Sequence, residues 1–271
     1  MKVTLPAVRI VVTVKHVPDI QAERTLGEDG RLARDGGDGT LNEVDENAVE
    51  AALVIAEGVG DGAEVVALTM GPDDAVDAAR RALQMGAASA VHVCDDAAAG
   101  SDSLGTAHVL AAAVRRIAQD GPVDLVVTGM AATDGLTSLV PAALAAELDL
   151  PALTLAHEVE VTGGTVTVRR ELDHADETLR AALPALISVS DSANEARYPN
   201  FAGIMAARKK PVTTWTLADL GVDPATVGAA GALARVESAA PRPPRTDRVL
   251  VTDTGDAGAR LAAYLVERKL V

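Results

Sequence analysis

Val8-Arg9-Ile10-Val11-Val12-Thr13-Val14 is a nearly unbroken run of β-branched residues close to the start of the chain. Such a run is typical of a strand that is buried on both faces of a parallel sheet. Strand and helix patterns then alternate to about residue 150, which predicts an α/β fold with a doubly wound parallel sheet. The further strands are expected at residues 64–69, 90–94 and 124–128, and the helices at residues 45–57, 73–85, 104–119 and 139–147.

Local signals refine these boundaries. Asp73 is expected to cap the start of the helix 73–85, and Gly86 fits the cap at its end. The polar, Gly/Asp-rich stretch 15–41 predicts a long loop, alone or with short strands. No regular helix or strand pattern dominates it.

The alternation of strand and helix patterns ends at Pro151. Residues 158–162 and 165–171 flank Gly163-Gly164 and predict a β-hairpin, and residues 186–190 predict another short strand. The stretch 211–236 is mixed. A Pro/Arg-rich linker at 239–245 leads to an amphipathic helix at 258–269. We therefore expect a domain of residues 1–236, followed by a linker and helix at 237–271 that docks elsewhere, on this chain or on a partner.

Composition excludes several classes of function. The chain carries 39 Asp+Glu against 24 Lys+Arg residues, a net charge of −15, which argues against binding nucleic acid or an anionic membrane. Its single cysteine, Cys94, allows neither an intrachain disulfide nor a Cys-based metal cluster. No apolar stretch predicts membrane insertion, and the N-terminus shows no secretory signal, so we expect a cytoplasmic protein.

Aromatic residues are scarce. The four are Tyr198, Phe201, Trp215 and Tyr264, and the first 197 residues contain none. That stretch therefore offers no ring on which a base or a flavin could stack. The core is expected to consist of Ala, Val, Leu and Ile.

The common catalytic patterns are also missing from the sequence. It has no G-x-x-x-x-G-K-[ST], no G-x-G-x-x-G after the first strand, no H-E-x-x-H and no G-x-S-x-G. The five histidines are scattered without the spacing of metal ligands, and we expect Cys94 to be a small core residue. Nothing here predicts a self-sufficient enzyme.

The first candidate site is the loop from Gly129 to Ser138, after the fourth expected strand. Ligands of open α/β sheets bind beyond the carboxyl ends of the strands, and the helix start that follows offers free N–H groups to a phosphate. The alternative is an ordinary strand-to-helix loop with Ser138 as the helix cap. A second candidate is residues 41–46, where Asn42 and Asp45 are most simply explained as helix caps.

The third candidate is the segment 194–210, which contains Tyr198 and Phe201 around Pro199. An aromatic residue on an exposed loop, in a chain that omits aromatics from its core, indicates a binding anchor. The alternative is a small satellite core beneath the loop. The basic cluster Arg208-Lys209-Lys210 is explained equally well as a complement to the C-terminus of a helix.

Taken together, these segments resemble the β subunit of electron transfer flavoprotein. Their order and spacing match the family over nearly the whole chain, and the Thr133-Asp134-Gly135 form resembles its actinobacterial and clostridial branch. The matching segments are residues 14–19, 42–50, 69–72, 82–87, 129–141 and 194–210.

The resemblance implies a Rossmann-like domain, of the adenine-nucleotide α-hydrolase type, in a heterodimer that carries electrons. Electrons would pass from acyl-CoA or related dehydrogenases to a membrane quinone oxidoreductase. The redox FAD would be held mainly by the α subunit, and this chain would bind AMP structurally. In bifurcating relatives a second FAD replaces the AMP, and this alternative stays open.

The resemblance also assigns roles to residues. Partner docking falls to an apolar side chain at Phe201 and its neighbours, and Glu171 matches a glutamate that restrains the mobile FAD domain. The implied docking residues are Glu195, Arg197, Tyr198, Phe201, Ile204 and Met205. The implied AMP contacts are Thr13, Asn42, Val44, Asp45, Met70, Gly129, Met130, Ala132, Thr133, Asp134, Gly135, Leu136, Thr137, Ser138, Leu139 and Val140.

The sequence departs from the family pattern at three places. Ala196 replaces the proline usual in Asn-Glu-Pro-Arg, Met130 and Ala131 replace more polar residues, and His174-Ala175 interrupts an acidic or Gly-rich run. Two rival functions keep the fold. One is a stand-alone adenine-nucleotide-binding protein of the universal-stress type, which has no use for an exposed Phe201. The other is a nucleotide hydrolase, which the missing Gly/Lys phosphate motif disfavours.

Overall fold

A computed structural model describes residues 8–21, 24–27, 29–34, 39–60, 62–240, 242–244, 246 and 248–271. Contacts divide the chain into two units, Met1–Glu237 and Ser238–Val271. The first unit carries every site predicted above. The second contains the C-terminal helix.

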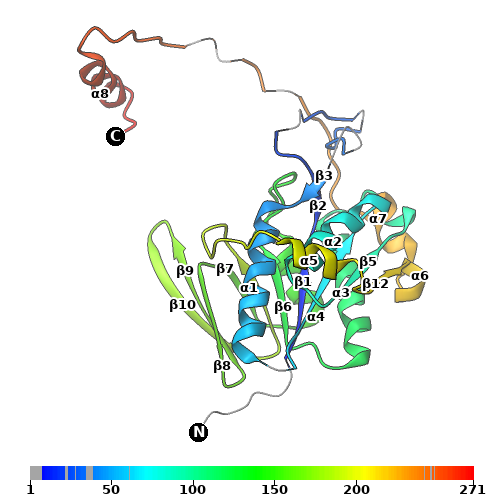
Figure 1. Cartoon of the computed structure of the whole chain (residues 1–271). Coiled ribbons are helices and arrows are strands. Elements are labelled where there is room, and N and C mark those ends of the chain that lie inside the picture. Colours follow the sequence, from blue (N-terminus) through cyan, green and yellow to red (C-terminus); the bar gives the residue numbers. More distant parts are fainter. Residues whose placement is uncertain are drawn as a thin grey trace. The chain divides into compact units, whose positions relative to one another are not determined.

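The centre of the first unit is a seven-stranded parallel sheet (Figure 1). It confirms the α/β, doubly wound fold expected from the sequence. The run quoted first becomes the central strand, and its Ile10, Val11 and Val12 are fully buried. In spatial order the strands are β12 (Val212–Trp215), β5 (Ser89–Val93), β4 (Glu64–Met70), β1 (Arg9–Thr13), β6 (Leu125–Gly129), β11 (Ala185–Val189) and β7 (Ala152–Ala156).

Four helices cover the two faces of this sheet. The helices α1 (Glu43–Val59) and α2 (Val76–Met85) pack on one face, where their side chains join Ile10 and Val12 in one core cluster. On the other face, α3 (Ser103–Ile117) and α4 (Val140–Leu148) enclose Val11. Both cores consist of aliphatic residues, as the composition predicts.

One predicted helix start is wrong. Residues 73–75 form a short 3₁₀ turn, η1 (Asp73–Ala75), and α2 begins only at Val76. Asp73 caps neither element with its side chain and instead lies 3.4 Å from Cys94 Sγ. At the other end of α2, Gly86 takes the cap position with a φ of 146°, as expected.

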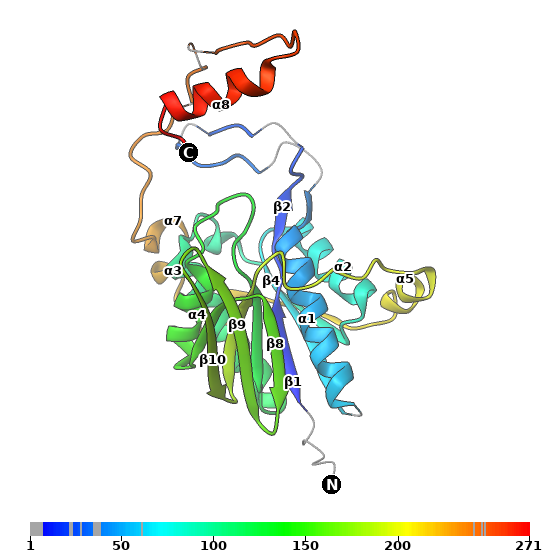
Figure 2. The same ribbon diagram turned by 90° about the vertical axis from the view of Figure 1, so that its left-hand side faces the viewer.

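A three-stranded antiparallel sheet follows the main α/β alternation. Figure 2 shows β8 (Glu158–Thr162), β9 (Thr165–Leu172) and β10 (Ala175–Ala182) together. The hairpin expected around Gly163-Gly164 joins β8 to β9. Val166 and Val168 of β9 are fully buried against the core beneath. The strands β10 and β7 were not predicted from the sequence.

Shorter elements complete the first unit. The strands β2 (His16–Pro18) and β3 (Gly39–Leu41) pair within the long polar stretch, and α5 (Phe201–Ala207) packs against α2. The Lys210 ammonium donates to the carbonyl oxygens of Leu83 (3.0 Å) and Ala87 (2.6 Å) at the end of α2, so the last residue of the basic cluster complements a helix C-terminus. The remaining helices are η2 (Asp96–Ala98), η3 (Ala118–Asp120), α6 (Leu217–Leu220), η4 (Pro224–Thr226) and α7 (Gly228–Gly231).

The second unit contains α8 (Ala257–Glu267), which buries none of its residues. Leu261 and Val266 leave 57% and 65% of their surface exposed. An amphipathic helix without a covered face is typical of one that binds a partner. Among the described residues, no helix is both long enough and apolar enough to span a membrane.

Candidate functional site

The strand order places a switch point at β1. From β1 the chain proceeds to β4 and β5 on one side, and then crosses to β6 on the other. Because all these strands are parallel, their carboxyl ends lie at one edge, which brings Thr13, Met70 and Gly129 to the same end of the sheet. A crevice at such a point is where open α/β sheets bind ligands.

Asn42 fixes the loop 129–140 to the start of α1. The residue is completely buried, and its amide donates to the Ala131 carbonyl (3.0 Å) while its side-chain oxygen accepts from the Thr133 N–H (3.0 Å). Asn42 occupies the N-cap position of α1, but its side chain makes no capping bond. The interpretation of Asn42 as an ordinary cap is therefore wrong, because its polar atoms serve the loop.

The first turn of α1 packs closely on the last residue of β6. A Cβ added at Gly129 would collide with the Asp45 carboxylate and lie 3.1 Å from the Val44 carbonyl oxygen. The position therefore requires glycine. Asp45 is buried and accepts a 2.8 Å hydrogen bond from the Lys15 N–H. Burial raises the pKa of Asp45 to about 7, although hydrogen bonds from Lys15 and Asn42 oppose the shift.

Asp134, a carboxylate within the loop 129–140, is neutralised by two cations. Asp134 lies 2.8 Å from the Lys15 ammonium and 2.7 Å from Arg34 Nε, and only 2% of its side chain is exposed. Burial by itself raises the pKa of Asp134, but the two cations outweigh burial and hold it below the usual value. Because Lys15 follows β1 and Arg34 belongs to the long polar stretch, the triad ties three segments together.

The rest of the loop has an unusual backbone. Leu136 and Ser138 both adopt left-handed conformations with φ of 50°, which cost energy in residues other than glycine and are common at ligand sites. Ser138 is not the helix cap, as the alternative supposed, because Leu139 occupies that position and no side chain caps α4. Pro141 has no N–H, so the first turn of α4 offers the N–H groups of Val140 and Ala142 to an anion.

The structure thus gathers the residues implied for AMP binding. They come from the ends of β1, β4 and β6, the first turn of α1, and the loop into α4. Thr137 in this loop also reaches the start of α3, with its hydroxyl 3.4 Å from that of Ser103. The site is therefore bordered by elements on both faces of the sheet.

The segment predicted as a binding anchor is displayed on the surface. Tyr198 and Phe201 are 83% and 78% exposed, and Met205 is 41% exposed. The alternative of a satellite core beneath the loop is therefore wrong for both aromatic residues. The Arg81 guanidinium lies 5.0 Å from the centre of the Tyr198 ring, a cation–π distance.

The base of this segment is fixed to α1. Arg197 pairs with Glu50 (2.7 Å) and with Glu57 (2.6 Å), and Asn47 donates to the Asn194 carbonyl (2.8 Å). The guanidinium of Arg197 is thus engaged within the chain, whereas Glu195 stays exposed. Arg197 supports the loop, and the exposed side chains around Phe201 form its contact surface.

Glu171 lies elsewhere, on the antiparallel sheet. Its side chain is 57% exposed, and its neighbour in the ion-pair geometry is His157, whose Nε2 lies 3.8 Å away. The position leaves the carboxylate accessible from solvent. Within the described part of the chain, no hydrogen bond or ion pair links Glu171 to the loop 129–140.

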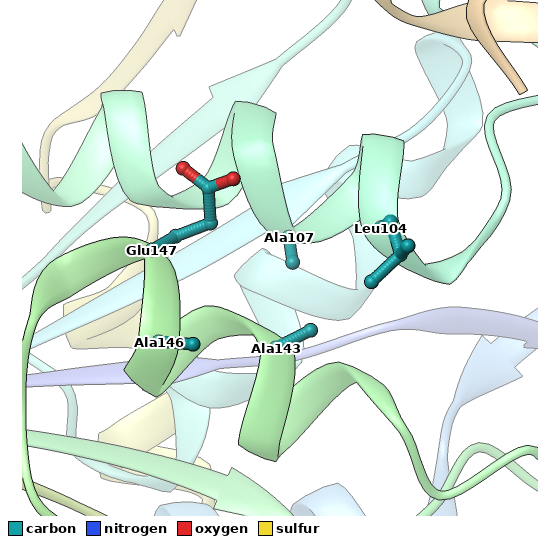
Figure 3. Close-up of a pocket in the computed structure, with 5 residues that line it drawn as sticks. All are labelled: Leu104, Ala107, Ala143, Ala146 and Glu147. Atoms are coloured by element: carbon teal, nitrogen blue, oxygen red, sulfur yellow. The ribbon is translucent and has the colours of Figure 1, made fainter. Parts of the chain in front are cut away.

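The structure also contains a hollow of about 380 Å³ between α3 and α4 (Figure 3). Leu104 and Glu147 lie at its two ends, and Ala107, Ala143 and Ala146 line it between them. None of these residues belongs to a site predicted from the sequence. The described residues contain no cluster of His, Cys, Asp and Glu that could hold a metal ion.

Sequence reasoning missed the residues that support the two loops. Lys15 and Arg34 pair with Asp134, and Glu50 and Glu57 hold Arg197. The two glutamates are seven residues apart and so share a helix face, but nothing local indicates their partner. Such long-range pairs become visible only in the folded chain.

The raised pKa of Asp45 predicts a pH-dependent loss of stability. The folded state retains a proton on Asp45 that the unfolded state has released, so stability falls as pH rises from about 4 to 7. Between pH 5 and pH 8, the free energy of unfolding should decline by roughly 2 kcal/mol more in wild type than in Asp45→Asn, measured by urea denaturation.

Asp134→Asn is the matched control for this measurement. The pKa of Asp134 is lowered, so its stabilising contribution is lost only as pH falls well below 5. The difference between wild type and Asp134→Asn should stay constant from pH 5 to pH 8. A constant difference for Asp45→Asn as well would show that Asp45 is ionised throughout.

Comparison with known proteins shows the family of this chain. The family model described as the electron transfer flavoprotein domain matches residues 29–220. The β subunits of electron transfer flavoprotein from Mycobacterium tuberculosis and Mycobacterium leprae are 46% and 45% identical, over 97% of this chain and 99% of each relative. A caffeyl-CoA reductase–Etf complex subunit, CarD of Acetobacterium woodii, is 32% identical over 97% of this chain and all of the relative. The chain therefore belongs to the electron transfer flavoprotein family, as a β subunit.

Proposed function

We propose that this β subunit binds AMP at the switch point of its sheet and works as half of a heterodimeric electron carrier in the cytoplasm. The observation that carries the proposal is the loop 129–140. Asn42 anchors its first part through Ala131 and Thr133, and Leu136 and Ser138 adopt left-handed conformations farther along, beside an uncapped helix. Left-handed residues in a loop that is anchored by buried hydrogen bonds are typical of a ligand site.

The residues of the loop suit a nucleotide monophosphate. Gly129 lets the first turn of α1 lie directly against the start of the loop, because a methyl group there would collide with Asp45. The Thr137 and Ser138 hydroxyls and the free N–H groups of α4 provide donors for a phosphate. Met130 and Ala131 contribute no polar side chain, so we assign their part in binding to the backbone. Asn42 and Asp45 support the loop from the side of α1.

The α subunit is the proposed partner that holds most of the FAD. Bound FAD supplies the redox chemistry of the pair, and the β subunit contributes position and surroundings. The exposed helix α8 is proposed to dock on the α subunit, which would cover the apolar side chains of Leu261 and Val266. Glu171, exposed on the antiparallel sheet, is proposed to restrain the domain that carries the FAD.

The segment 194–203, a loop that runs into the first turn of α5, is proposed to dock acyl-CoA or related dehydrogenases. The reduced carrier then delivers its electrons to a quinone oxidoreductase. Phe201 protrudes from a base that Arg197 and Asn194 fix to α1. A rigid base and an exposed aromatic side chain are the features of an interface hot spot, because little entropy is lost on binding.

Asn42→Ala tests the nucleotide site. The variant removes both bonds that hold the loop, so the affinity of the heterodimer for AMP should fall at least about tenfold by isothermal titration, with FAD content unchanged. Asn47→Ala is the matched control, since Asn47 lies on the same helix but holds the docking loop. Equal AMP affinity in Asn42→Ala and wild type would show that the loop is not part of the AMP site.

Phe201→Ala tests the docking surface. Loss of the exposed ring should slow electron uptake from the reduced dehydrogenase by roughly tenfold at subsaturating concentration, while AMP and FAD contents stay at wild-type levels. Leu104→Ala, on α3, is the control for loss of an exposed apolar side chain. Wild-type rates for Phe201→Ala in stopped-flow flavin absorbance would place the anchor elsewhere.

A further inference from the structure

The carboxylate of Asp102 accepts four backbone N–H groups from two distant parts of the chain. Its Oδ1 accepts from Leu104 (3.1 Å) and Gly105 (2.9 Å), in the first turn of α3. Its Oδ2 accepts from Leu233 (2.8 Å) and Ala234 (3.0 Å). These last two residues precede the boundary at Glu237, where the first unit ends. One side chain thus joins a helix start to the point where the chain leaves the domain.

Backbone contacts seat the preceding residues in the same region. The Gly228 N–H donates to the Ser101 hydroxyl (2.8 Å), and the Ala229 N–H donates to the Ala99 carbonyl (2.9 Å). A side chain at Gly228 would collide with the carbonyl oxygen of Ala97. The segment 228–234 is therefore held through its backbone. The Leu233 side chain remains 82% exposed.

The four bonds require an ionised carboxylate, since each of its oxygens must accept twice. The amide of asparagine would turn an N–H group toward one of the two pairs of donors. Although burial opposes ionisation, the backbone N–H groups hold the pKa of Asp102 below its usual value. The N-terminus of α3 adds a favourable dipole.

We propose that Asp102 is a positioning residue for the C-terminal arm. By fixing Leu233 and Ala234, it sets the direction in which the chain leaves the first unit and so limits the volume that α8 explores. The inference rests on the proposed docking of α8 on the α subunit. A tether with a fixed origin raises the effective concentration of the helix at its partner, and a loose origin lowers it.

Two measurements test the proposal with the full chain. Asp102→Asn should weaken the affinity of the α–β pair about tenfold, measured by titration of labelled subunits. In the chain without its partner, the same substitution should accelerate trypsin cleavage after Arg235 about tenfold, because that bond follows the released residues. Cleavage after Arg248, farther along the arm, should keep its wild-type rate. General unfolding would accelerate both cuts.

Asp95→Asn is the matched control. Asp95 also bridges distant segments, accepting from the N–H groups of Ala97 (3.0 Å) and Leu217 (3.1 Å), but it makes none of the described contacts of residues 228–234. The affinity of the Asp95→Asn variant for the α subunit should stay within about twofold of wild type. Ala234→Pro removes one N–H donor and leaves Asp102 and α3 intact. This variant should also weaken the pair, and its effect should not add to that of Asp102→Asn.

The outcomes separate this inference from the proposed function. A chain ending at Glu237 should lose affinity for the α subunit if α8 docks there. If that truncation weakens the pair but Asp102→Asn and Ala234→Pro do not, the positioning role is refuted and the docking of α8 stands. If the truncated chain binds the α subunit as tightly as wild type, the docking of α8 is refuted, and the positioning role with it.

Discussion

The polar side chains of α1 are the support on which both functional loops depend. At its start, the buried Asn42 holds the loop 129–140 through two hydrogen bonds, and Asp45 packs beneath Gly129. Farther along the helix, Asn47 and Glu50 hold the segment 194–203 through Asn194 and Arg197. One helix thereby fixes a nucleotide site at the edge of the sheet and a docking surface on its flank. A displacement of α1 would move both.

Energy is spent locally to build these supports. The buried carboxylate of Asp45 has a raised pKa. Leu136 and Ser138 adopt left-handed conformations, which residues other than glycine rarely adopt. Packing of the aliphatic core on both faces of the sheet offsets these local energetic costs. With no ring in the first 197 residues, the exposed Tyr198 and Phe201 are an exception that packing does not explain. Their exposure is consistent with binding a partner.

The sequence predicts the parts of this molecule that local patterns determine. The β-branched run before Lys15 and the alternation after it give the parallel sheet, and small residues after β6 identify the loop. The strand β10 was missed because its only large apolar residue is Leu179, and its first half, Ala175–Thr178, is mostly polar, so its pattern is weak. Asp73 was misassigned because a 3₁₀ turn precedes α2, and the capping preference does not distinguish the two kinds of helix.

The site residues divide in the same way. Those in contiguous segments, such as Asn42 and the loop 129–140, were identified, although the role of the Asn42 side chain was not. Arg34 and Glu50 were missed because their partners, Asp134 and Arg197, lie 100 and 147 residues away in sequence. No local preference encodes such a pair. Ion pairs of this kind can be identified only once the fold is known.

The loop fixed by Asn42 is proposed to be the AMP site of this β subunit. The most direct measurement is the nucleotide content of the chain purified together with its α subunit, released by denaturation and quantified by chromatography and mass spectrometry. We expect one AMP and one FAD for each heterodimer. Two FAD molecules without AMP, or FAD with no second nucleotide, would contradict it.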